Sequence, residues 1–211
     1  VFSSIDYNGR YAFFNQPGIT KWNLSRFAET LLPLINKNED KAISIANELI
    51  NNFDFIYEKK WLLMMRSKLG FFGEEMEDKN LIEDLLKWMK KNNADYTNTF
   101  CLIMSPTIKK EKIFKNQEFI NWYIRWENRI KGNKKTKEES IELMKINNPL
   151  VIARNFKVEE CLAAATKDKN LKPLHTLLSY LKKPYKEQPG ISDFQTVPNS
   201  NGEKYITFCG T

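Results

Sequence analysis

The chain has 211 residues, of which 42% are hydrophobic and 13% aromatic, and this content is ample for a buried core. Lysine and arginine number 33 against 26 aspartates and glutamates, so the net charge of +7 is a mild excess spread along the chain. Such a spread does not favour a nucleic-acid-binding surface, whose signature is a clustered basic stripe.

The cysteines and the apolar segments argue against several further classes. Cys101, Cys161 and Cys209 are widely spaced and lack a C-x-x-C pair, which disfavours a zinc site and a disulfide framework. No apolar run approaches the roughly 18 to 20 residues that span a bilayer, and the first residues do not form a signal peptide. We therefore expect a cytoplasmic protein that has no membrane partner.

Apolar residues recur at helical spacing from Pro17 to Leu181, and no strand-like alternation interrupts them. The expected helices cover residues 17–36, 39–69 with a break near 51–52, 78–89, 95–104, 116–130, 137–146, 158–166 and 171–181. Gly70 is a candidate C-terminal cap, and Asp78 and Asp95 (or Thr97) are candidate N-terminal caps. The predicted fold class is therefore all-α, an irregular multi-helix bundle.

Three segments follow from this pattern. Residues 1–16 form a loop, residues 17–183 a helical domain, and residues 184–211 a tail in which proline and glycine break any helix. The charge-dense residues 129–140 are interpreted as an exposed loop between two helices, with a phosphate or acidic-partner contact as the alternative.

No pattern for nucleotide binding or catalysis occurs in the sequence. Neither G-x-x-x-x-G-K nor G-x-G-x-x-G is present. The single histidine, His175, lies on a helical stretch without a suitably spaced acid, which favours a helix-surface or core-edge position. The acids between Glu74 and Asp84 are interpreted as charged helix starts rather than as metal ligands. We thus predict no catalytic residue and no metal ligand.

The loop before the first helix is unusually rich in large polar and aromatic groups. Asn8-Gly9 predicts a turn, and Pro17 has the φ that suits a first helical position. Asp6, Arg10, Tyr11, Asn15 and Gln16 are the candidate functional residues of this loop. Two interpretations of Arg10 remain: it contacts a phosphate or an acidic substrate, or it pairs with Asp6 or caps helix carbonyls.

Several short stretches together resemble the selenoprotein O family, also called YdiU. "DYNGRYAFFNQP" at 6–17 and "WNLSRFAETLLPLI" at 22–35 resemble the segment that follows that family's metal-binding loop. "KLG" at 68–70, "DYT" at 95–97, "NP" at 148–149, "RN" at 154–155 and "FCGT" at 208–211 follow in the family's order. The resemblance therefore extends over almost the whole chain.

The resemblance implies a pseudokinase-fold protein adenylyltransferase, which transfers AMP from ATP to hydroxyl side chains of proteins with magnesium. It implies that the ATP and magnesium site lies upstream of Val1, so this chain is expected to be an inactive C-terminal helical fragment that binds no cofactor. The candidate loop residues would lie beside the activation segment and the substrate. The expected partners are the missing kinase-like part of the same chain and protein substrates, with no nucleic acid.

The cysteines depart from the family's pattern. Family members often pair an activation-segment cysteine with a C-terminal cysteine or selenocysteine, whereas residues 1–11 here contain none. Cys209 is thus a possible redox residue that is expected to be a free thiol, in a tail that folds back toward the N-terminal loop. Cys101 stands where many members have an arginine.

An alternative from another class is a helical module that binds a protein or nucleic-acid partner through a basic face. The order of the motifs favours the first interpretation, a fragment of a protein resembling the selenoprotein O family.

Overall fold

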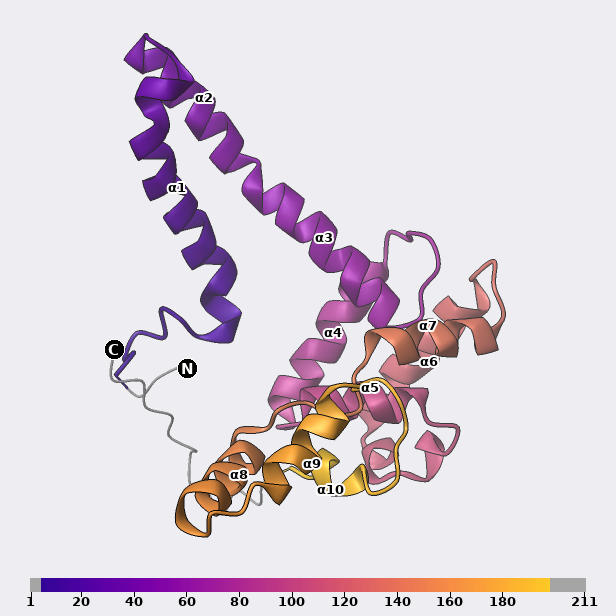
Figure 1. Cartoon of the computed structure of the whole chain (residues 1–211). Helices are drawn as coiled ribbons and strands as arrows, with labels where there is room; N and C mark the ends of the chain where they lie inside the picture. Colours follow the sequence, from indigo (N-terminus) through magenta and orange to yellow (C-terminus); the bar gives the residue numbers. More distant parts are fainter. Residues whose placement is uncertain (1–4, 198–211) are drawn as a thin grey trace. The chain divides into compact units, whose positions relative to one another are not determined.

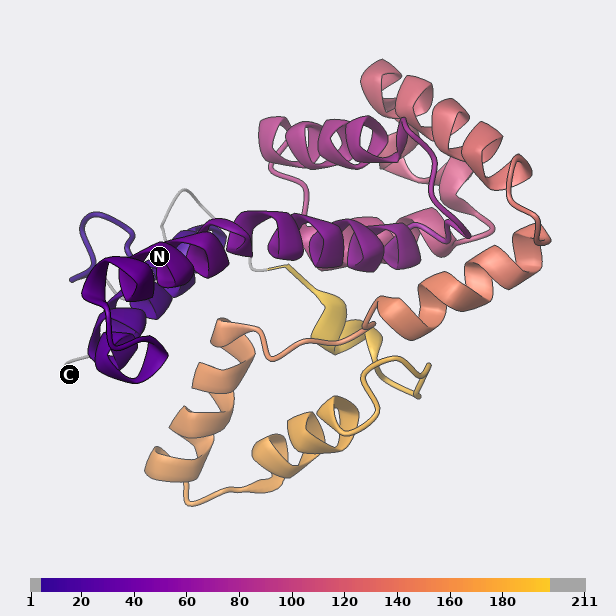
Figure 2. The same cartoon turned by 90° about the horizontal axis from the view of Figure 1, so that it is seen from above.

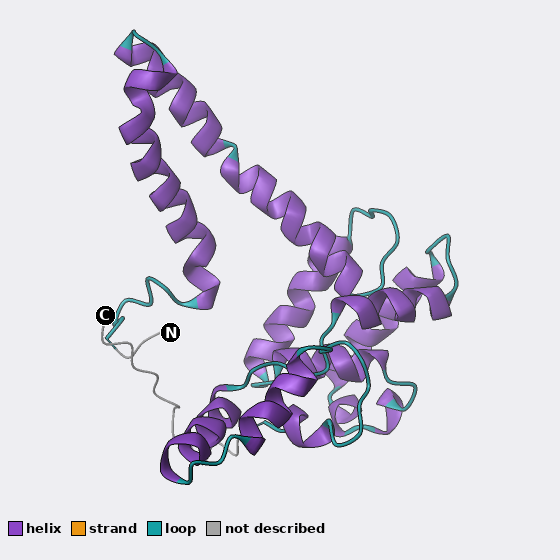
Figure 3. Cartoon of the chain, viewed as in Figure 1, coloured by secondary structure: helices purple, strands orange, loops and turns teal. Residues whose placement is uncertain are grey.

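A computed structural model describes residues 5–197 of the chain. Helices, loops and turns make up these residues, and no strand occurs among them (Figure 3). The predicted all-α fold is therefore confirmed for the described part. This part forms two compact units, one from residue 5 to Trp61 and one from Leu62 to residue 197. The predicted segment bounds and the kinase-like resemblance stay predictions.

The first unit is built on an antiparallel pair of helices. α1 (Gln16–Ile35) and α2 (Glu39–Asn51) lie side by side, and a short 3-10 helix, η1 (Phe13–Asn15), precedes them (Figure 1). Asn38 caps α2 because its side chain accepts a hydrogen bond from the Lys41 N–H. α3 (Phe53–Lys68) starts two residues after α2 ends, which confirms the predicted break.

The second unit contains the end of α3 and the remaining helices. These are α4 (Asp78–Lys91), α5 (Tyr96–Met104), η2 (Ile108–Lys110), η3 (Lys112–Lys115), α6 (Gln117–Lys131), α7 (Lys137–Asn147), α8 (Asn155–Lys167), α9 (Lys172–Leu181) and α10 (Ser192–Gln195). α4 packs on α6, and α8 and α9 lie side by side (Figure 2, orange to yellow).

The core of the second unit is centred on α6. Phe119, Trp122, Tyr123 and Trp126 recur at helical spacing on its inner face and are all buried. The indole N–H of Trp122 donates to the Leu81 carbonyl at 2.8 Å, and that of Trp126 donates to the Leu69 carbonyl at 2.9 Å. These bonds satisfy the buried indoles and join α6 to α4 and to the end of α3.

Helix boundaries follow the capping chemistry of the sequence. Asp95 accepts the Asn98 N–H, so Asp95 rather than Thr97 caps α5. Gly70 follows α3 with φ +74°, as expected for a C-terminal cap, and a Cβ there would lie 2.7 Å from the Ser140 carbonyl oxygen.

Three local predictions were wrong. Asp78 is the first residue of α4 rather than its N-cap, and its carboxylate binds two arginines instead of capping α4. The loop within residues 129–140 is shorter than predicted, because α6 extends to Lys131 and Ser140 is buried in α7. A one-turn helix, α10, forms in the tail that was expected to contain none.

Candidate functional site

The candidate residues of the N-terminal loop form one compact turn. Both carboxylate oxygens of Asp6 accept backbone N–H groups, from Arg10 at 2.8 Å and from Tyr11 at 2.9 Å. Gly9 adopts φ +64°, as the Asn8-Gly9 turn requires, and its carbonyl accepts the side-chain amide of Asn15 at 2.8 Å. Asp6 and Asn15 therefore shape the loop.

Arg10 projects from this turn and stacks on α1. Its guanidinium lies 4.5 Å from the ring centroid of Trp22, while Arg26 lies 5.7 Å from the same ring and also pairs with Glu29. The Arg10 backbone N–H, not its guanidinium, binds Asp6, and the guanidinium forms no ion pair with any residue between 5 and 197. Its N–H groups are thus available to an anionic partner.

The two other candidate residues of the loop are exposed. Tyr11 is 52% exposed, and Gln16 begins α1. The structure therefore brings together Asp6, Arg10 and Asn15 in one turn, with Tyr11 and Gln16 on its outer surface.

A second polar cluster lies in the second unit, where motifs that are far apart in the sequence meet. Arg154 binds Asp95 through two parallel hydrogen bonds of 2.8 and 2.9 Å, and its NH2 group also donates to Asn98. Burial opposes ionisation of the Asp95 carboxyl, but the bonds from Arg154 and from the Asn98 N–H hold its pKa below the ordinary value.

Lys68 lies beside this pair in an apolar setting. Its ammonium is 4.4 Å from the ring centroid of Phe100 and donates to the Asn147 carbonyl at 3.3 Å. Burial lowers the pKa of Lys68. The side-chain amide of Asn148 donates to the Lys68 and Met144 carbonyls, both at 2.8 Å, and so connects the end of α3 to the end of α7.

Sequence reasoning missed this cluster. The stretches that contain Lys68, Asp95, Asn148 and Arg154 were quoted one by one, and nothing in their spacing indicated that they meet. One sequence signal could have indicated the cluster. Asparagine and arginine residues beside apolar helix segments become buried, and their side chains then need hydrogen-bond partners.

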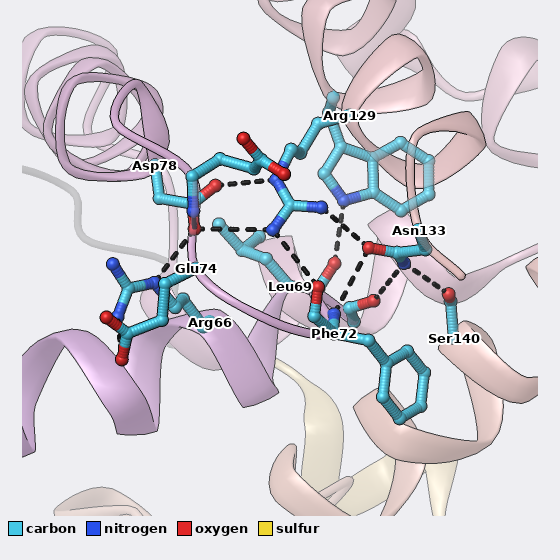
Figure 4. A network of polar contacts seen from close by, with 11 residues as sticks. Arg66, Leu69, Phe72, Glu74, Asp78, Arg129, Asn133 and Ser140 are labelled. Atoms are coloured by element: carbon cyan, nitrogen blue, oxygen red, sulfur yellow. Dashed lines mark hydrogen bonds and ion pairs between the residues drawn. The ribbon is translucent and has the colours of Figure 1, made fainter. Parts of the chain in front are cut away.

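A third cluster joins α3, α4, α6 and α7 (Figure 4). The buried carboxylate of Asp78 accepts hydrogen bonds from Arg66 at 2.8 Å and from Arg129 at 2.6 Å. Arg129 also donates to Asn133, which in turn donates to the Gly70 carbonyl and to the Ser140 hydroxyl. Burial again opposes ionisation, but the hydrogen bonds from Arg129, the Glu75 N–H and Arg66 hold the pKa of Asp78 low.

The cysteines within the described residues are free thiols. Burial raises the pKa of Cys101 to about 11, and its Sγ donates to the Pro149 carbonyl. Cys161 is buried in α8, and its pKa is raised by the same cause. Cys209, the candidate redox residue, and the predicted docking of the tail lie outside the described residues.

The remaining sequence candidates have ordinary surface roles. His175 is exposed on α9. Lys135 and Lys137 in the basic stretch pair with Glu139 and Glu127. Between residues 5 and 197, no group of three histidine, cysteine or acidic side chains is arranged to hold a metal ion, and no helix there is long and apolar enough to cross a membrane.

The described fold and contacts define an all-helical protein whose buried ion pairs join its helices and whose first helix follows a loop with an outward-facing arginine. A family model for the protein adenylyltransferase SelO matches residues 1–182, and the chain belongs to this family.

Several named relatives match the whole length of this chain. Each is a protein nucleotidyltransferase YdiU: that of Pelagibacter ubique is 50% identical over 211 residues, and those of Nitrosococcus oceani and Bacillus cytotoxicus are each 46% identical over the same length. All of this chain is matched, against 44% of the first relative and 43% of the other two. The chain thus spans less than half the length of these relatives.

Proposed function

We propose that this chain is the helical part of a protein adenylyltransferase, which transfers AMP from ATP to hydroxyl side chains of protein substrates. The observation that supports this proposal is the family match over residues 1–182, together with identities of 46 to 50% to named nucleotidyltransferases. The activity belongs to the longer protein of which this chain would form one part.

Between residues 5 and 197, no cluster of side chains fits a magnesium site. Asp6 accepts two backbone N–H groups and so shapes the loop, and no metal-binding cluster occurs in this range. Phosphoryl and nucleotidyl transfer need cations placed around the phosphates. We therefore assign ATP and magnesium to the family region that this chain does not cover.

The first unit offers a surface on which that region would pack. Phe27 and Leu34 lie two turns apart on one side of α1 and are 60% and 83% exposed, and Phe13 and Phe14 before it are 87% and 91% exposed. Water-exposed aromatic and aliphatic groups at this density mark an interface. The proposed occupant is the kinase-like part of the same protein.

Arg10 is the residue of this chain that we place nearest to the substrate. Its guanidinium lies over the indole ring of Trp22 and has no carboxylate partner within residues 5–197. A guanidinium in that state binds a phosphate or a carboxylate bidentately. Its proposed role is to hold an acidic group of the protein substrate or a phosphate.

A chimera tests the proposal. The matched 211 residues of the Pelagibacter ubique relative are replaced by this chain, and transfer of labelled AMP to protein is measured beside the intact relative. We expect the chimera to transfer AMP, and this chain alone to show neither transfer nor saturable binding of Mg-ATP by calorimetry. A folded chimera without transfer, or micromolar ATP binding by this chain, would contradict the proposal.

A further inference from the structure

A groove of about 960 Å³ opens in the second unit between α5, η2, α6, α7 and the segment around Tyr185. This volume lies at the upper end of the range for binding sites of small ligands. Its floor is apolar and well packed: Ile103, Ile108 and Trp126 are each at most 2% exposed. Met104, Ile141 and Leu150 also line the groove.

A hydroxyl group without a partner lies in the groove wall. Tyr123 lines the groove and is only 4% exposed, yet its hydroxyl forms no hydrogen bond with any residue between 5 and 197. Burial raises the pKa of this phenol to about 12, so the group stays a neutral donor. The residue is buried, but its hydroxyl oxygen does not belong to the fully buried unpaired atoms of the described residues, so the hydroxyl is accessible and can donate to a ligand in the groove.

The groove lining carries four glutamates and three lysines, a formal charge of 3 − 4 = −1, whereas the whole chain is positive. Lys109 and Lys137 both pair with Glu127, and Lys145 pairs with Glu142. Glu138 and Glu187 also line the groove and have no ion-pair partner among the described residues. A lining with two unpaired carboxylates, on a chain of net charge +7, favours a cationic partner over an anionic one.

We propose that this groove docks a short apolar segment of the protein substrate that carries an adjacent lysine or arginine. The apolar side chains lie on the floor, the basic side chain pairs with Glu138 and Glu187, and Tyr123 donates to a backbone carbonyl of the segment. Since no strand edge exists among the described residues, recognition rests on such side-chain anchors rather than on strand addition. This assignment of the occupant as substrate rests on the proposed function.

Peptide binding tests the groove without requiring activity. The probe is a fluorescein-labelled peptide of about twelve residues, with two leucines and two adjacent lysines on a glycine-serine background. By fluorescence anisotropy with the 211-residue chain, we expect a Kd on the order of 10 µM. Matched peptides with glutamates for the lysines, or serines for the leucines, should bind at least about tenfold more weakly.

Variants locate the binding on the protein. The double change Glu138→Lys and Glu187→Lys should weaken binding about tenfold, and Tyr123→Phe should weaken it about threefold. The control is the double change Glu159→Lys and Asp168→Lys, at exposed positions in α8 and at its C-terminal cap. It changes the net charge by the same amount and should leave the affinity for the peptide unchanged. Equal loss in both double variants would overturn the proposal, because it would indicate a general charge effect.

Two further outcomes separate this inference from the proposed function. In the chimera, the Glu138→Lys and Glu187→Lys pair should raise the KM for protein substrate while kcat stays unchanged. If the chimera transfers AMP but no peptide binds, the docking inference is wrong and the proposed function stands. If deletion of residues 198–211 strengthens peptide binding about tenfold, the tail of this chain is the occupant, and substrate docking is also overturned.

Discussion

Arg154 and Asp95, which are 59 residues apart in the sequence, are joined by two parallel hydrogen bonds of 2.8 and 2.9 Å. The pair fixes the residue before α8 to the N-terminal cap of α5. The Arg154 side chain is 9% exposed and that of Asp95 is 22% exposed, so the contact is partly shielded from water and salt.

Replacement of Arg154 by alanine should lower the free energy of unfolding by about 3 to 5 kcal/mol, because it leaves the Asp95 carboxylate without its partner. Arg154→Lys should recover only part of this loss, since an ammonium cannot form both parallel bonds. Urea denaturation followed by circular dichroism measures both. The exposed pair Arg125–Asp84 is the control, and Arg125→Ala should cost no more than about 1 kcal/mol.

The pH dependence of stability should show the contributions of Asp78, which is buried, and Asp95, which is half-buried. The folded-state pKa of Asp78 and Asp95 lies below the ordinary value of 3.8, so the unfolded chain binds more protons between the two values. Their contribution is therefore present above about pH 4 and is lost as the pH falls through the folded-state pKa. Urea midpoints from about pH 6 to about pH 3 should fall more steeply for the natural chain than for Asp95→Asn. Parallel curves would contradict this.

Substitutions at two glycines compare the stability cost of backbone strain with the added cost of a close contact. Gly70 and Gly73 have almost the same φ, +74° and +73°, but a Cβ on Gly70 would lie 2.7 Å from the Ser140 carbonyl oxygen, whereas nothing lies within 4 Å at Gly73. Gly73→Ala should cost about 1 to 2 kcal/mol for the left-handed backbone. Gly70→Ala should cost about 1 to 3 kcal/mol more, because the close contact adds to that strain. Thermal or urea unfolding of both variants compares them.

The cysteines should differ in reactivity. The thiol of Cys101 has a pKa of about 11 and is partly buried, so little thiolate is present at neutral pH. We expect iodoacetamide at about pH 7.5 to modify Cys101 and Cys161 much more slowly in the folded chain than in urea. Peptide mass mapping distinguishes the sites and also tests whether Cys209 is a free thiol. Rapid labelling of Cys101 in the folded chain would contradict its assignment as an unreactive thiol.

Arg10 and Arg26 approach the same indole ring and form a matched pair of variants. Only Arg10 lies on the turn that Asp6 organises, and only Arg26 is paired with Glu29. In the chimera, Arg10→Ala should lower AMP transfer at least about tenfold, which corresponds to about 1.4 kcal/mol of lost binding in the transition state, whereas Arg26→Ala should change it less than about twofold. Equal effects of the two variants would argue against a substrate or phosphate contact by Arg10.

The sequence by itself determined the helices, because apolar periodicity and capping residues act over a few residues. The break at 51–52, the Asp95 cap, the turn at Gly9 and the left-handed Gly70 all follow from local rules. The family could also be inferred from the sequence, since short motifs and their order can be recognised without any knowledge of contacts.

Only the tertiary structure decided what the polar residues do. Asp78 has the sequence context of a helix cap, yet its carboxylate binds Arg66 and Arg129, of which Arg129 lies 51 residues away. Lys68 and Arg154 likewise meet the residues around Asp95 and Asn148 through packing of distant helices. Helix formation depends on neighbours along the chain. A buried charge, in contrast, is satisfied by whichever partner the packing of helices brings within about 3 Å. No local sequence pattern encodes that choice of partner.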